Sequence, residues 1–126
     1  MNAPLHHNPV IWTEIPVANL DKAKAFFEAV LETSLIRQEM GPNVTMVFPY
    51  DGERGVAGHL YEGKPAAAGS GPTVHFQVHG TVEDAMARVT EAGGTVVSPV
   101  IEIPDGRFAY CTDPDGNSIG LFTFKS

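Results

Sequence analysis

The sequence of 126 residues has one cysteine, few basic residues and no long apolar run. Cys111 has no second thiol to pair with, so an internal disulfide is excluded, and no spacing of Cys and His is typical of a zinc site. Eight Lys and Arg, scattered along the chain against 15 Asp and Glu, give a net charge of −7. Nucleic acid is therefore excluded as a partner, because its phosphates need a basic patch.

The sequence also lacks the marks of export or membrane insertion. Residues 1–8 do not show a basic segment followed by an apolar run, and no apolar stretch approaches the roughly 20 residues of a membrane span. We therefore expect a cytoplasmic protein with no membrane partner. The length predicts a single domain, 43% apolar residues suffice for a core, and the 13 glycines and 10 prolines predict many turns between short strands.

An internal repeat is the strongest feature that is present. A shift of 61 residues places Val17 on Val78 and Leu60 on Leu121. This offset is kept across strand, loop and strand, which predicts two similar modules at about residues 9–62 and 72–125. Residues 63–71 are small and flexible in composition and are the predicted linker.

Each module shows the same predicted order of elements. An alternating strand at 10–17 or 73–78 is followed by a helix that Asn19 or Thr81 caps. Three short strands then follow, near 35–40, 44–50 and 56–61 in the first module and near 95–101, 107–112 and 118–124 in the second. The predicted fold class is α+β, with two tandem β-α-β-β-β modules pairing four-stranded sheets around a cleft.

This duplicated pattern resembles a known superfamily. The residues that carry the resemblance are Glu-Ile-Pro-Val at 14–17, the helix start at 19–23, Phe26-Phe27, and the turn and strand at 113–121 that begin Asp-Pro-Asp-Gly-Asn. Together they resemble the vicinal oxygen chelate superfamily of glyoxalase I, bleomycin-resistance proteins and extradiol dioxygenases, from residue 9 to residue 124. The resemblance implies the fold, a small-molecule ligand and a homodimer.

The resemblance also assigns positions to a divalent metal ion. Metal-using members carry His, Gln or Glu at matching strand positions, which fall here on Trp12, His59, Thr73 and Gly120. Only His59 is a competent ligand, because indole donates, glycine has no side chain and a neutral hydroxyl binds metals poorly. The chain is similar to a subgroup without the usual metal centre, and no cofactor is expected.

Polar residues nevertheless lie on the strand faces that turn away from the helices. Glu14 and His75 are 61 residues apart, so we expect them to face each other as an acid–base pair, a ligand anchor or a self-satisfied buried pair. A displaced metal site at Glu14, His59 and His75 stays open.

Trp12 is either a platform for a flat ligand or core filler. The candidate catalytic residues are Glu14 and His75, and the candidate ligand-binding residues are Trp12, His59, Thr73 and Gln77.

Three functions remain open at this point. The first is a metal-independent protein that binds a small polar or aromatic molecule in the cleft. The second is a glyoxalase-like lyase or isomerase of a small carbonyl compound, with Glu14 or His75 as general base. The third is a scaffold whose cleft is filled by side chains.

Overall fold

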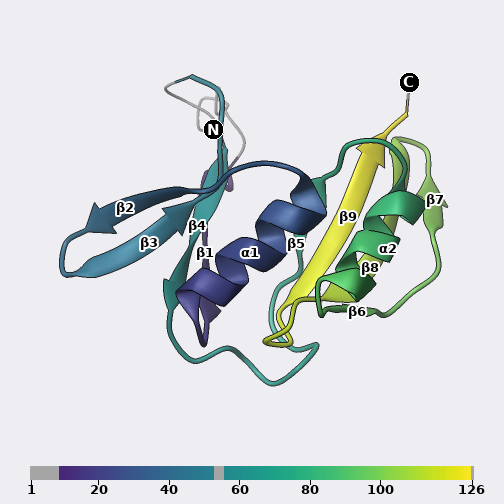
Figure 1. Ribbon diagram of the computed structural model, residues 1–126. Helices are drawn as coiled ribbons and strands as arrows, with labels where there is room; N and C mark the ends of the chain where they lie inside the picture. Colours follow the sequence, from purple (N-terminus) through teal and green to yellow (C-terminus); the bar gives the residue numbers. More distant parts are fainter. Residues whose placement is uncertain (1–8, 53–55, 126) are drawn as a thin grey trace, which may run out of the picture.

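Two similar modules build the fold, and the second has one more strand than the first (Figure 1). The computed structural model describes residues 9–52 and 56–125, so the N-terminal residues 1–8 lie outside it. The first module consists of β1 (Trp12–Val17), α1 (Leu20–Leu31), β2 (Ile36–Met40), β3 (Asn43–Val47) and β4 (Ala57–Glu62). The second consists of β5 (Val74–Gln77), α2 (Val82–Glu91), β6 (Thr95–Val96), β7 (Ile101–Ile103), β8 (Gly106–Thr112) and β9 (Ser118–Phe124).

Each module forms its own sheet. The strand orders are β1-β4-β3-β2 and β5-β9-β8-β6, with β7 also pairing with β8. The first and last strands of each module are parallel neighbours, and the other pairs are antiparallel. The α+β class and the tandem modules are thus confirmed. A single strand over 95–101 is wrong. Val97 and Ser98 both donate to the carbonyl oxygen of Tyr110, which interrupts the regular ladder, and Pro99 has no N–H to continue it.

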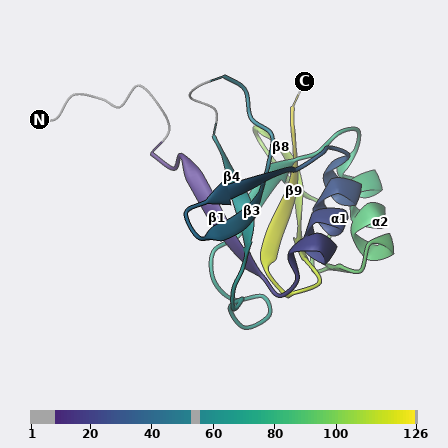
Figure 2. The ribbon, with the colours of Figure 1, turned by 60° about the vertical axis from the view of Figure 1, so that its left-hand side comes forward.

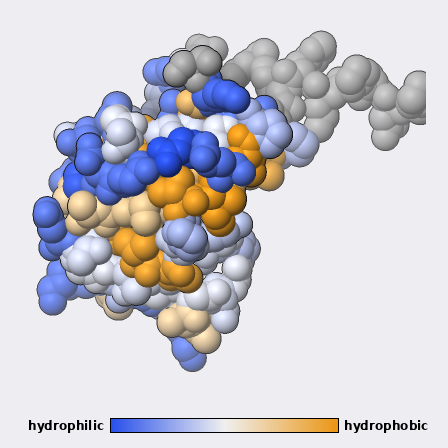
Figure 3. Space-filling view, turned by 90° about the vertical axis from the view of Figure 1, so that its right-hand side faces the viewer, coloured by the Kyte–Doolittle hydropathy of each residue, from blue (hydrophilic) through white to orange (hydrophobic). Residues whose placement is uncertain are grey.

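The helices lie side by side on one side of the strands (Figure 2). The side chains of Asn19 and Thr81 cap them as predicted, accepting from the backbone N–H of Lys22 and of Asp84. Neither helix in the described part of the chain is long and apolar enough to cross a membrane. On the side of the molecule where β7 lies, apolar side chains reach the surface between hydrophilic ones (Figure 3).

The core is shared by the two modules. Phe27 of α1 is fully buried, and its ring lies 5.5 Å from both Phe48, just after β3, and Phe76 of β5. Phe48 and Phe76 are themselves 5.1 Å apart. Because Phe76 belongs to the second module, a single apolar cluster extends through both.

The turn at 113–117 also ties the modules together. Asp113 Oδ1 accepts the backbone N–H of Asp115 at 3.0 Å and that of Asn117 at 2.8 Å. The side-chain amide of Asn117 donates to Asp113 Oδ2 and to the carbonyl oxygen of Pro16 in β1, each at 2.9 Å. The Asp-Pro-Asp-Gly-Asn segment therefore has a structural role, because it shapes its own turn and anchors the second module to the first.

Replacing Asn117 by alanine should lower the free energy of unfolding by about 1–3 kcal/mol, because Asp113 and the Pro16 carbonyl lose a donor in a partly buried place. Urea denaturation would measure the change. Asn43→Ala, at the exposed first residue of β3, is the matched control and should cost less than about 0.5 kcal/mol. Equal effects of the two variants would contradict the anchoring role of Asn117.

Candidate functional site

A groove runs along the first strands of the two modules. β1 and β5 are edge strands of their sheets, and the groove that they line has a volume of about 1250 Å³. Five of the six predicted site residues line it, namely Trp12, Glu14, Thr73, His75 and Gln77. The alternation of side chains along the strands thus brings these residues to one surface.

His59, the sixth predicted residue, lies beneath two of the others. The residue is 6% exposed, and β4 places it beside Glu14 of β1 in the parallel register. Trp12 Nε1 donates to His59 Nδ1 at 2.9 Å. Because an indole nitrogen can only donate, Nδ1 must accept, and the hydrogen of the neutral imidazole is on Nε2. That nitrogen lies 3.3 Å from Glu14 Oε1, so both ring nitrogens of His59 are engaged.

The partner of Glu14 differs from the predicted one. The 61-residue repeat predicted that Glu14 faces His75, whereas the structure pairs its carboxylate with His59. The repeat relates Glu14 and His75 as equivalent positions of two modules, which does not bring them into contact. Neighbouring strands of one sheet do bring residues together, and Glu14 and His59 are register partners in β1 and β4. The side chain of Glu14 remains 67% exposed.

His75 lies among aromatic rings of the second module. Its ring is 5.2 Å from Phe108, 5.7 Å from Tyr110 and 6.5 Å from Phe122, each in an edge-to-face arrangement. We call Phe108, Tyr110 and Phe122 the aromatic cluster. In β9, Gly120 is the register partner of His75, and a Cβ at that position would overlap the imidazole. Gly120 stands at a position that the resemblance assigns to a metal-binding side chain. Here its missing side chain leaves room for the His75 ring.

Burial lowers the pKa of His75 below its ordinary value of 6.5. The unfolded chain therefore binds a proton at a pH where the folded protein does not, and stability falls as the pH drops from about 6.5 through the lowered pKa. His75→Gln should remove part of this slope, as measured by urea denaturation at a series of pH values. His79→Gln, at another exposed histidine that lines the groove, is the control. An unchanged slope in His75→Gln would contradict the assignment.

Other residues complete the groove, and sequence reasoning missed some of them. The hydroxyl of Thr73 is hydrogen-bonded to that of Ser118. Tyr50, which follows β3, packs its ring edge-on to Trp12 at 5.7 Å and is 48% exposed. His79 also lines the groove. Tyr50 is the last residue of the strand predicted at 44–50, although the structure ends β3 at Val47. His79 directly follows the strand predicted at 73–78.

The residues present do not fit the divalent ion that the resemblance implies. Among residues 9–52 and 56–125, no three His, Cys, Asp or Glu side chains converge as a set that could hold a metal ion. Trp12 directs an N–H at His59, and Gly120 offers no side chain. The displaced set of Glu14, His59 and His75 is not assembled either, because Glu14 and His59 pair in the first sheet while His75 lies on the aromatic cluster of the second.

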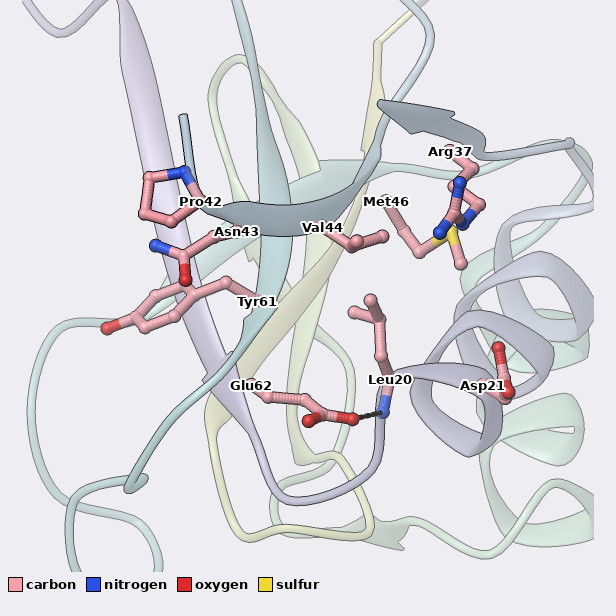
Figure 4. Close-up of a pocket in the computed structure, with 9 residues that line it drawn as sticks. All are labelled: Leu20, Asp21, Arg37, Pro42, Asn43, Val44, Met46, Tyr61 and Glu62. Carbon is pink, nitrogen blue, oxygen red and sulfur yellow. Dashed lines mark hydrogen bonds between the residues drawn. The ribbon is translucent and has the colours of Figure 1, made fainter. Parts of the chain in front are cut away.

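A second cavity of about 450 Å³ lies between the start of α1 and the β2–β3 hairpin (Figure 4). Leu20, Val44 and Met46 form its apolar part, and Figure 4 shows polar side chains around them. The carboxylate of Glu62 accepts the backbone N–H of Leu20 at 3.3 Å and so satisfies a free donor at the start of α1. None of the six predicted site residues lines this cavity, so the groove is the candidate site.

Comparison with known proteins finds a matching family model and similar curated proteins. The family model of the Glyoxalase/Bleomycin resistance protein/Dioxygenase superfamily matches residues 10–121. Two curated proteins from Mycobacterium bovis and Mycobacterium tuberculosis, each named "Putative glyoxylase CFP32", are 34% identical over 113 residues, which is 85% of this chain and 41% of theirs. The chain therefore spans less than half the length of these relatives.

Solved structures show the same fold. A glyoxalase/bleomycin resistance protein from Albidiferax ferrireducens T118 has a TM-score of 0.64 at 23% identity, covering 89% of this chain and 95% of that one. A glyoxalase/bleomycin resistance protein/dioxygenase family enzyme from Burkholderia phytofirmans PsJN has a TM-score of 0.67 at 13% identity, covering 92% and 98%. At these identities the likeness extends to the fold alone.

Proposed function

Because the chain belongs to the Glyoxalase/Bleomycin resistance protein/Dioxygenase superfamily, we propose that it binds a small polar or aromatic molecule in the groove between its modules, with no metal ion as anchor. The observation that carries the proposal is the hydrogen bond from Trp12 Nε1 to His59 Nδ1. It occupies the lone pair of the one competent ligand among the family's metal positions. Binding must then rest on rings and hydrogen-bonding groups of the groove.

The groove offers both kinds of contact. Trp12 and Tyr50 present aromatic surface, which suits a flat ligand. The exposed carboxylate of Glu14 accepts hydrogen bonds, and His59 holds it in place from below. Thr73 and Gln77 add polar side chains from β5. A flat molecule that carries N–H or O–H groups matches this combination.

A lyase or isomerase acting on a small carbonyl compound is the second candidate. The observation that favours it is the placement of Glu14, an exposed carboxylate whose Oε1 lies 3.3 Å from Nε2 of the buried His59. Such a carboxylate can take a proton from the carbon beside a carbonyl group. His75, whose pKa is lowered by partial burial against the aromatic cluster, lines the same groove and can supply a hydrogen bond to the carbonyl oxygen.

Thermal stabilisation by a panel of aromatic amines, aromatic acids and dicarbonyl compounds tests the proposal. A compound present at about 100 times its Kd stabilises the folded protein by roughly 2.7 kcal/mol. We expect Glu14→Gln and His75→Ala to weaken binding about tenfold or more, while Glu91→Gln, exposed on α2, leaves it unchanged. Unchanged stabilisation in both groove variants would contradict the site.

Two further measurements separate the alternatives. Turnover of a carbonyl compound that Glu14→Gln abolishes without loss of binding would favour the lyase or isomerase. Elemental analysis of protein purified without chelator addresses the metal. A stoichiometric divalent ion there would contradict the metal-independent proposal, because Trp12 would then have to release His59.

A further inference from the structure

The outer edge of the first sheet is unusually open. β2 is the edge strand, and four of its five residues are exposed, so both of its faces lack a covering layer. Figure 1 shows the β2–β3 hairpin projecting beyond α1, away from the second module. A strand of this kind presents a row of backbone N–H and C=O groups to solvent. Such an edge is a template for another strand.

The equivalent edge of the second module is built differently. There the chain forms β6, with two residues, and β7, with three, and Pro99 lies between them. Short edge strands and proline are common means by which proteins prevent unwanted strand pairing. The two modules are otherwise alike, so the continuous β2 edge of the first module stands out as a surface available for pairing.

The hairpin determines which backbone groups β2 turns outward. Met40 and Asn43 flank the two-residue turn at 41–42, and such a pair exchanges both of its hydrogen bonds. By alternation, Gln38 and Ile36 also turn their backbone groups toward β3. The hydroxyl of Thr45 in β3 donates to the carbonyl oxygen of Gln38 at 2.8 Å, which agrees with this direction. The outward backbone groups are therefore those of Arg37 and Glu39.

We propose that β2 pairs antiparallel with β2 of a second copy of this chain, with Gln38 opposite the partner's Gln38. In this register Arg37 lies opposite the partner's Glu39, and Glu39 opposite the partner's Arg37. The backbone N–H and C=O groups of Arg37 and Glu39 point away from β3. Each residue can therefore exchange two backbone hydrogen bonds with the residue opposite it in the second copy. Ile36, which is 63% exposed, lies opposite the partner's Met40 on the other face.

The charges select this register over its neighbours. Shifting the pairing by one residue on each strand would place Arg37 opposite the partner's Arg37, or Glu39 opposite the partner's Glu39. Like charges directly opposite each other destabilise a strand pair. In the described part of the chain, neither Arg37 nor Glu39 forms an ion pair, so both are available to a partner.

Charge-reversal variants test the interface by sedimentation velocity over a range of protein concentrations. Arg37→Glu and Glu39→Arg each place like charges at both pairs, and each should weaken dimer formation roughly tenfold or more. The double variant exchanges the two charges and should dimerise like the original chain. An equimolar mixture of the single variants should form a heterodimer for the same reason.

Matched controls keep the result specific to β2. Lys22→Glu and Glu91→Arg make the same charge changes on exposed helix positions and should leave dimerisation unchanged. A chain that stays monomeric at every concentration overturns the proposal. A dimer that tolerates both single variants also overturns it, because the second copy then binds elsewhere. Failure of the double variant to recover would show that the charges do not set the pairing, which overturns the proposed register.

Discussion

Replacing Phe27 by alanine should lower the free energy of unfolding by about 3–5 kcal/mol. The side chain is fully buried, and its ring contacts those of Phe26, Phe48 and Phe76 at centroid distances of 5.0–5.5 Å. Because Phe76 comes from the second module, the cavity would open where the two modules share their core. Domains are stable by only about 5–15 kcal/mol, so this one change should remove a large part of the total.

Urea denaturation of Phe27→Ala would measure this effect. Phe27→Leu keeps most of the volume and should cost about 1.5 kcal/mol. Phe124→Ala removes a ring that is 64% exposed and should cost less than either. If Phe27→Ala cost no more than Phe124→Ala, Phe27 would not join the modules. A cooperative loss of both modules in one transition would agree with the shared core.

The architecture was largely predictable because the local patterns and the repeat agree. Apolar residues at helical spacing after Asn19 predicted the helix that the structure places at Leu20–Leu31. The 61-residue shift then predicted the same order in the second module, and this is confirmed. The division of the strand near 95–101 was not predicted. It depends on the geometry at 97–98, where two successive N–H groups donate to the Tyr110 carbonyl oxygen, and on Pro99, which has no N–H.

The candidate site was predictable only in part. Alternation along a strand determines which side chains share a face, so the common groove of Trp12, Glu14 and His75 follows from spacing. Contacts between faces depend on strand register and module docking, which spacing does not determine. The pairing of Glu14 with His59 comes from the parallel β1–β4 register. The hydrogen bond from Trp12 Nε1 to His59 Nδ1, which makes His59 unsuitable as a metal ligand, also depends on side-chain geometry.

Gly58→Ala should lower the free energy of unfolding by about 3 kcal/mol. Gly58 is buried in β4 opposite Thr13 of β1, and a Cβ there would overlap the carbonyl oxygen of Thr13. A backbone atom in a sheet cannot move aside without breaking the strand pair. Because His59 is the next residue, the same shift should also disturb its bonds to Trp12 and Glu14.

Gly120→Ala provides the informative contrast. A Cβ at this position would overlap the His75 imidazole, which is a side chain that can rotate away. We therefore expect a smaller loss of stability than in Gly58→Ala, together with displacement of His75 from the aromatic cluster. Relief of burial should return the pKa of His75 toward 6.5, which an NMR titration would detect. An unchanged titration, or a stability loss equal to that of Gly58→Ala, would mean that Gly120 is required by the strand rather than by His75.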